Sequence, residues 1–294
     1  MVDANKLMRI RDQQKSSLEF DSAAAQFAPM TDIAFILSGF FVGFVVGLTG
    51  VGGGSLMTPI LIFGFGIKPI LAVGTDLLFA AFTKLGGTVN LTLARRIDWK
   101  IVGTLSIGSI PAALLTVWAI HQAGAASESL QKIMTTTLGV ALLLTAVATL
   151  YKAIKGASSG SQRDLSPAEL EQATKPRHPA LPILFGALIG VLVSLTSVGA
   201  GAIGVTALML LYPALPLSRI VAADVAYAVP LTLVAGLGHA SIGSVDWPLL
   251  AKLLAGSLPG IWLGTKLGNH VPDRAIRSIL SLLLAYAGFK LLAI

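Results

Sequence analysis

The chain contains no cysteine, few charged residues and only four histidines. The absence of cysteine excludes disulfides, thiolate chemistry and cysteine-ligated metals. The histidines, at positions 121, 178, 239 and 270, lack the spacing of a zinc motif, so we expect no metal site and no cofactor. Charged residues make up 12% of the 294 residues, against about 25% in soluble domains. We therefore exclude an ordinary soluble enzyme, a disordered protein and a nucleic-acid binder.

What the chain has in abundance is apolar surface. Apolar residues make up 54% of the sequence, and its mean hydropathy is +0.81. A soluble protein of this size could not hide that surface from water. The composition therefore predicts an all-α, polytopic transmembrane bundle surrounded by lipid. The net charge of +7 fits basic loops that face anionic lipid.

Eight apolar segments are long enough to form membrane-spanning helices, since a spanning helix needs roughly 20 residues. They cover about 32–66, 69–94, 100–121, 131–151, 181–213, 216–242, 248–268 and 274–293. The first and fifth are too long for one straight span, and glycines interrupt both.

A polar linker, rich in Ser, Gly, Pro and charge, separates the two hydrophobic halves. We expect a polar cytoplasmic tail at 1–31, a first transmembrane repeat at 32–151, a cytoplasmic linker at 152–180 and a second repeat at 181–294. Within the linker, Ser166 and Glu169 have the spacing of a capping box and favour a short helix. The tail lacks an apolar run followed by a cleavage site, so we expect no signal peptide.

The two halves share an ordered series of matching residues. Leu48-Thr-Gly-Val-Gly-Gly-Gly54 matches Leu195-Thr-Ser-Val-Gly-Ala-Gly201 at an offset of 147. Asp76 matches Asp224, and Asp98-Trp99 matches Asp246-Trp247, at an offset of 148. The series indicates an internal duplication. Transporters built from two such halves bind their substrate at the interface of the halves, near the membrane midplane.

The topology has two alternatives. If the first and fifth segments are broken helices that still span, there are about eight spans, and the basic loops and both termini lie in the cytoplasm by the positive-inside rule. The repeats are then parallel. If these segments turn back as re-entrant hairpins, the number of crossings changes and the two basic loops move outside. An odd number of crossings in each half makes the repeats inverted. We expect the first arrangement.

The glycine-rich segments are the first candidate site. Consecutive glycines weaken a helix, and an unwound backbone survives in lipid only where protein or water satisfies it. Each following half-helix would direct its positive N-terminus and free N–H groups at the gap, which suits an oxyanion. The predicted substrate-binding residues are Thr49, Gly50, Gly52, Gly53, Gly54 and Ser55 in the first half, and Thr196, Ser197, Gly199 and Gly201 in the second. The alternative is close helix packing through small residues.

Four ionisable residues lie inside predicted spans or at their ends. Asp76 and Asp224 are equivalent in the repeat and are expected to carry protons or to act as gates, since intramembrane carboxylates are costly. Lys84 would add positive charge for an anion, and His239 would take part in proton coupling. Structural capping or hydrogen bonding is the alternative for the acids and for the histidine.

The glycine motif and the residues after it resemble those of the TauE/SafE sulfite exporter family, also called the 4-toluene sulfonate uptake permease family. The resemblance rests on Gly47-Leu-Thr-Gly-Val-Gly-Gly-Gly-Ser-Leu-Met-Thr-Pro-Ile-Leu61, on Ala72-Val-Gly-Thr-Asp76, and on the second copy at 194–201 with the Asp224 region. It covers about residues 33–294. The resemblance implies transport of sulfur-containing anions across the bacterial inner membrane.

These observations together predict a non-enzymatic secondary transporter of a small sulfur oxyanion, sulfite or an organosulfonate, coupled to protons. An anion channel or a carboxylate transporter is the alternative, and an intramembrane enzyme is the least favoured reading, because Asp76 is not directly preceded by glycine as in aspartyl intramembrane proteases. The small-residue faces are also compatible with an oligomer.

Overall fold

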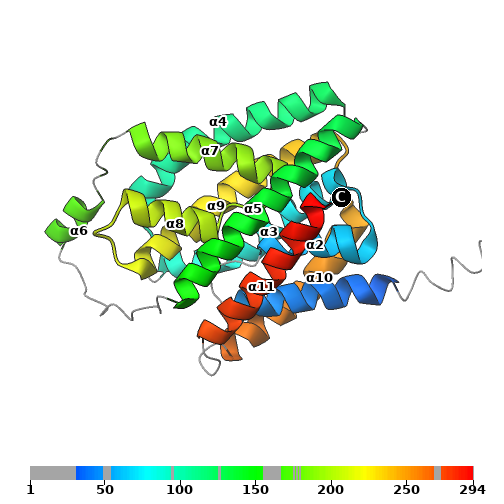
Figure 1. The fold of residues 1–294 in the computed structure, drawn as a ribbon. Helices are drawn as coiled ribbons and strands as arrows, with labels where there is room; N and C mark the ends of the chain where they lie inside the picture. The colour runs from blue at the N-terminus through cyan, green and yellow to red at the C-terminus, as the bar shows by residue number, and fades with distance from the viewer. Residues whose placement is uncertain are drawn as a thin grey trace, which may run out of the picture.

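The computed structural model describes residues 31–48, 54–93, 96–124, 127–154, 167–174, 176, 178, 180–267 and 273–293. The described part is helical throughout (Figure 1). It begins with an N-terminal helix, Thr31–Leu48. The first half continues with α2 (Gly54–Phe65), α3 (Pro69–Leu93), α4 (Trp99–Ala123) and α5 (Glu128–Ile154), and the linker holds α6 (Pro167–Ala173). The second half contains α7 (Ala180–Thr196), α8 (Ala202–Leu211), α9 (Leu217–Ser241), α10 (Trp247–Leu267) and α11 (Asp273–Leu292).

The helices repeat with the same spacing as the sequence. The first residues of α2, α3 and α4 each lie 148 positions before those of α8, α9 and α10. The predicted all-helical membrane bundle is confirmed. Each repeat consists of a longer helix, a short helix and three further helices. The glycine-rich break before α8 lies within the described residues, whereas residues 49–53, between the first helix and α2, lie outside them.

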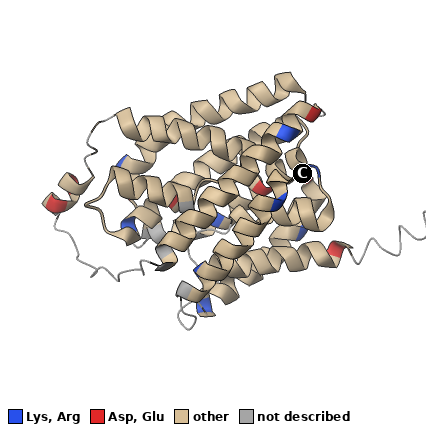
Figure 2. Cartoon of the chain, in the orientation of Figure 1, with Lys and Arg blue, Asp and Glu red and all other residues tan. Residues whose placement is uncertain are grey.

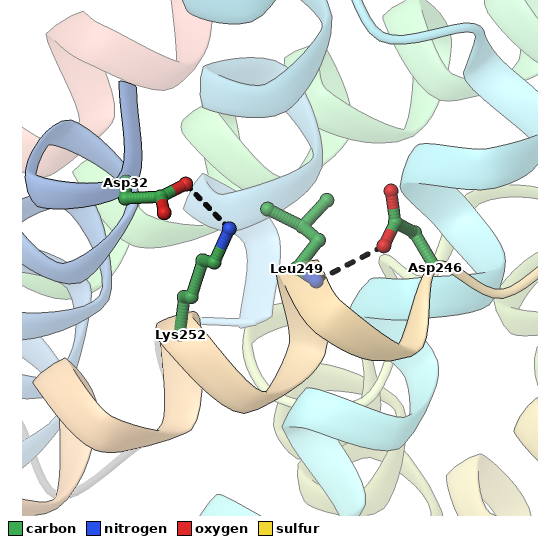
Figure 3. A network of polar contacts seen from close by, with 4 residues as sticks. All are labelled: Asp32, Asp246, Leu249 and Lys252. Atoms are coloured by element: carbon green, nitrogen blue, oxygen red, sulfur yellow. Dashed lines mark hydrogen bonds and ion pairs between the residues drawn. The ribbon is translucent and has the colours of Figure 1, made fainter. Parts of the chain in front are cut away.

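Equivalent aspartates begin α4 and α10. The carboxylate of Asp98 accepts hydrogen bonds from the backbone N–H groups of Lys100 and Ile101 at 3.1 and 3.4 Å, and that of Asp246 accepts one from Leu249 at 3.0 Å (Figure 3). These bonds satisfy N–H groups that a helix start leaves without a partner. The repeated Asp-Trp pair is therefore a helix-start signal in both halves.

The N-terminal helix and α2 form a hairpin that returns to the membrane face from which it started. The rings of Phe35, near the start of the hairpin, and Phe65, at its end, have centroids 4.4 Å apart. The Lys290 ammonium, near the end of α11, lies 4.7 Å from the centroid of the Phe63 ring. Lys252 of α10 forms an ion pair with Asp32 (Figure 3). We call this end of the bundle the terminal face; it holds the start of the first helix and the end of α11.

The opposite end of the bundle, which we call the linker face, holds α6. A cavity of about 520 Å³ there brings Asp98 and Lys100, at the start of α4, together with Glu171 of α6 and Arg219, at the start of α9. A second cavity of about 260 Å³ adds Tyr212, which follows α8, and Pro176, which precedes α7. Helices α7 and α8 therefore also form a hairpin, with both outer ends on the linker face (Figure 1).

The two hairpins decide between the topologies that the sequence leaves open. Helix α3 runs from the terminal face to the linker face, whereas its equivalent α9 runs back and reaches the terminal face, where the backbone N–H of Asp246 donates to the Thr75 hydroxyl at 3.0 Å. The eight apolar segments are present, but the first and fifth turn back, and the repeats are inverted. The expectation that both termini lie with the basic loops on one face is corrected: the chain enters and leaves the described bundle on the terminal face, opposite those loops.

Glycines allow the hairpins to pack closely against the other repeat. A Cβ atom at Gly108 of α4 would lie 1.9 Å from the carbonyl oxygen of Ile183 in α7. At the equivalent Gly256 of α10 it would lie 1.9 Å from the carbonyl oxygen of Ile36. Only glycine permits backbones to approach this closely, as in small-residue contacts of membrane helices. Thus α4 of the first repeat packs against α7, the first helix of the second repeat, and α10 of the second repeat packs against the N-terminal helix.

The outer surface of the bundle is apolar, and Figure 2 shows most charged residues toward the ends of the helices. Six described helices are long and apolar enough to cross a membrane, and α7 and the helical residues 55–65 of α2 are shorter and also apolar. The four tryptophans lie exposed at or near the ends of α4 and α10, at positions 99, 118, 247 and 262. Tryptophan is enriched where membranes meet water, so these residues mark two interfaces.

Candidate functional site

The interior of the bundle contains a series of polar side-chain atoms that are buried and meet no hydrogen-bond partner among the described residues. They belong to α3, α4, α7, α9 and the break before α8, namely to Asp76, Thr88, Ser109, Ser194, Ser197, Tyr227 and His239. Buried polar groups are normally paired, because leaving one unpaired costs about 1–3 kcal/mol. Such a concentration along the helices that join the two repeats is therefore a candidate functional site.

Asp76 is fully buried on α3 and faces α2. Its Oδ2 atom accepts a hydrogen bond from the Thr58 hydroxyl at 2.5 Å, whereas Oδ1 has no partner in the described part of the chain. The Ser197 hydroxyl also acts on this carboxylate, although its geometry falls short of a hydrogen bond. Because Ser197 belongs to the second repeat, Asp76 links the first hairpin to the break in the second.

Lys84 lies two turns further along α3 and is 5% exposed. Its ammonium donates a hydrogen bond to the carbonyl oxygen of Ala200 at 3.5 Å, directly in the break before α8. The charges of Asp224 and Asp76 both act on it, that of Asp224 more strongly. A buried cation between two carboxylates, held against a broken helix, can attract a small anion into the bundle.

Asp224 occupies on α9 the place that Asp76 occupies on α3, and it is 1% exposed. A Cβ atom added to Gly204 would lie 2.0 Å from its Oδ1, so this carboxylate packs directly against the first turn of α8. Each aspartate therefore contacts the short helix of its own repeat, Asp76 through a threonine and Asp224 through a glycine. Since the repeats are inverted, the two carboxylates lie toward opposite membrane faces.

The break before α8 has a backbone that ordinary residues seldom adopt. Ser197, Gly199 and Gly201 have φ angles of 58°, 144° and 128°. The Thr196 hydroxyl accepts a hydrogen bond from the Val198 N–H at 3.1 Å and lies 2.6 Å from the carbonyl oxygen of Leu192, to which it donates. Thr196 therefore stabilises the break, while Ser197 directs its hydroxyl toward Asp76. Gly201 precedes α8 without a side-chain cap on the helix start.

His239 lies apart from these charges, near the terminal face. It is fully buried, its Nε2 is 2.9 Å from the carbonyl oxygen of Ser194, and its Nδ1 has no partner among the described residues. Its Cβ packs 3.1 Å from the Cβ position of Gly74, where α3 and α9 approach each other. The histidine thus joins α9 to α7 at the tip of the second hairpin.

The predicted residues Thr49, Gly50, Gly52 and Gly53 lie outside the described residues, whereas Gly54 and Ser55 begin α2. Within the described part, no cluster of three His, Asp or Glu could hold a metal ion. The hydroxyl of Thr58 belongs to the predicted glycine-rich segment and lies at Asp76, whereas sequence reasoning missed Ser109 and Tyr227. Each is a hydroxyl in an apolar run of a predicted span, and this signal alone does not distinguish an interior position from a lipid-facing one.

The inverted repeats, the broken helices and the buried charges define a membrane transport protein. Residues 35–291 match the family described as "Sulfite exporter TauE/SafE", and the chain belongs to this family. It is 38% identical to the probable membrane transporter protein YjnA of Bacillus subtilis over 260 residues, which cover 88% of this chain and 99% of that protein. No solved structure matches the chain.

Two more distant relatives have similar names. The probable membrane transporter protein YunE of Bacillus subtilis is 26% identical over 279 residues, covering 90% of this chain and 98% of that protein. The probable membrane transporter protein MJ0441 of Methanocaldococcus jannaschii is 27% identical over 278 residues, covering 87% and 94%. The match therefore extends over nearly the whole bundle, including both hairpins.

Proposed function

We propose that this chain carries a small sulfur oxyanion, sulfite or an organosulfonate, across the membrane together with protons. The observation that carries the proposal is Lys84, a buried ammonium that donates to Ala200 in the break before α8. Intramembrane cations are expensive and normally face a pathway or a partner. The family name supports a sulfur oxyanion as the cargo.

Proton coupling follows from the charges around Lys84. One ammonium and two carboxylates leave the interior with a net negative charge whenever Asp76 and Asp224 are both ionised. Two like unit charges 4 Å apart repel by about 4 kcal/mol at an effective dielectric constant of 20. An anion therefore enters more readily when at least one carboxylate has taken up a proton. Anion and proton then move together.

The inverted repeats give each membrane face its own aspartate. Asp76 packs against the hairpin that opens to the terminal face, and Asp224 against the hairpin that opens to the linker face. Lys84 lies between them on α3. Rocking one repeat against the other would expose the carboxylates in turn, as expected for alternating access around a midplane site.

We also propose that the linker face is cytoplasmic in a bacterial inner membrane. The linker and the starts of α4 and α9 carry an excess of basic residues, among them Lys100, Arg219, Lys155, Arg163 and Lys175. Short basic loops remain inside. Both ends of the described bundle then lie on the outer side, as the hairpins require.

The test combines binding with transport. Purified protein is heated with sulfite, sulfate, taurine, sulfoacetate, lactate or chloride, because a ligand that binds only the folded state raises its stability, by about 2.7 kcal/mol at 100 times its Kd. Proteoliposomes then measure sulfite uptake driven by a proton gradient. We expect Lys84→Met to abolish uptake and Lys252→Met, a lysine at the terminal face, to retain it.

Three results would overturn the proposal in different ways. Stabilisation by lactate alone would show that the substrate is a carboxylate and not a sulfur oxyanion. Sulfite that crosses the membrane but never accumulates against its gradient would indicate an anion channel. Unchanged sulfite uptake by Lys84→Met would refute the binding site at Lys84.

A further inference from the structure

Tyr227 and Ser109 are buried hydroxyl residues to which the transport scheme above assigns no role. Tyr227 lies on α9 and Ser109 on α4, and neither side chain is exposed. The Ser109 hydroxyl acts on the phenol of Tyr227, yet neither oxygen meets a hydrogen-bond partner within the described chain. Two neighbouring buried hydroxyls without a partner are costly unless a ligand accepts hydrogen bonds from them.

The two hydroxyls lie at the depth of Lys84. Tyr227 and Ser109 each come ten residues after the start of their helix at the linker face, and Lys84 comes nine residues before α3 ends there. At a rise of 1.5 Å per residue these positions are all about 14–15 Å from that face, near the middle of a hydrocarbon core roughly 30 Å thick. Helices α4 and α9, and α3 and α9, pack against each other, so the three groups share one layer of the bundle.

The internal repeat supplies the natural comparison. Phe79, 148 positions before Tyr227, is equally buried, so the fold accommodates an aromatic ring there without a hydroxyl. Ser257, the equivalent of Ser109, donates its hydroxyl to the carbonyl of Leu254 at 3.4 Å. The unpaired hydroxyls therefore occur where α4 meets α9 and not at the equivalent positions of α10 and α3, so the packing of the fold does not require them.

The neighbouring carboxylate does not account for them either. Asp224 lies one helical turn before Tyr227 and its charge acts on the phenol, but no hydrogen bond joins the two side chains within the described chain. Its Oδ1 lies 2.0 Å from the Cβ position of Gly204 of α8.

We infer that Tyr227 and Ser109 form a hydroxyl subsite that donates hydrogen bonds to an oxygen of the transported oxyanion while Lys84 balances its charge. The inference rests on the proposed anion transport. A tetrahedral or pyramidal oxyanion presents several acceptor oxygens, so one can meet the ammonium and another the hydroxyl pair. Chloride and other monatomic anions cannot make both contacts. The subsite therefore selects oxyanions.

The experiment measures sulfite uptake into proteoliposomes by the wild type, Tyr227→Phe, Ser109→Ala and the control Ser257→Ala. We expect Tyr227→Phe and Ser109→Ala each to raise the KM for sulfite roughly tenfold, the effect of losing one hydrogen bond to a charged group. Ser257→Ala should keep the wild-type KM. Thermal unfolding without ligand should show Tyr227→Phe at least as stable as the wild type, because it removes an unpaired group and no packing.

The outcomes separate this inference from the transport proposal. If the wild type takes up sulfite, Lys84→Met does not, and both hydroxyl variants keep the wild-type KM, the hydroxyls bind water only and the subsite is refuted. If the wild type moves no oxyanion of the panel, both proposals fall. If Ser257→Ala raises the KM as much as Ser109→Ala does, the effect is general packing, and the subsite is again refuted.

Discussion

Gly108 on α4 offers the sharpest test of the way in which the two repeats hold each other. A Cβ atom at this position would lie 1.9 Å from the carbonyl oxygen of Ile183 and 2.8 Å from its carbon. Contacts under 3.0 Å are essentially never found for a real Cβ atom, so α4 and α7 would have to separate by more than 1 Å. The contacting atom belongs to the backbone of α7, so no side-chain movement can relieve the clash. Overpacking of this kind costs typically 1–3 kcal/mol, and occasionally more.

The matched control lies on the same helix. Gly103 has nothing within 4 Å of its Cβ position, so Gly103→Ala adds only helix propensity, worth up to about 1 kcal/mol. Both variants gain this propensity, so we expect Gly108→Ala to be less stable than Gly103→Ala by the overpacking cost of about 1–3 kcal/mol. Gly256→Ala, at the repeat-related crossing, should lose as much as Gly108→Ala, because its Cβ would lie at the same 1.9 Å from Ile36.

The assay is thermal and denaturant unfolding of the purified variants in detergent, with the recovered folded fraction as a second readout. If Gly108→Ala proved as stable as Gly103→Ala, the close crossing of α4 and α7 would be refuted. If Gly256→Ala alone were tolerated, the two crossings would not be equivalent, and the account of each repeat holding the first helix of the other would fail.

Two further predictions concern the buried aspartate and the orientation. Thr58→Val removes the hydroxyl that donates to Asp76. It should lower the unfolding free energy by about 1–3 kcal/mol, the cost of an unsatisfied buried acceptor, and weaken proton-driven uptake; wild-type stability would contradict the contact. A reporter fused after residue 294 should be active only on the outer side of the membrane, and one inserted between residues 158 and 162 only in the cytoplasm; the reverse pattern would refute the proposed orientation.

The site shows where sequence reasoning succeeds and where it stops. Asp76, Asp224 and Lys84 are visible in the sequence because charge is rare within apolar runs, and the structure brings all three together in the interior. Thr196 was predicted as a ligand, yet its hydroxyl is occupied by backbone groups of the break. Hydroxyl residues are inexpensive enough to occur on any helix face, so Ser109 and Tyr227 gave no signal.

The topology shows the same limit in the backbone. Composition, segment lengths and the repeated Asp-Trp pair determined a helical membrane bundle made of two related halves, because burial in lipid and helix capping are local requirements. Whether a glycine-broken segment crosses the membrane or turns back depends on what its two helices pack against. Here the ring of Phe35 packs against that of Phe65, and Gly108 and Gly256 allow helices of the other repeat to pack closely. Only these tertiary contacts decided that the repeats are inverted and that Lys84 lies between carboxylates from opposite halves.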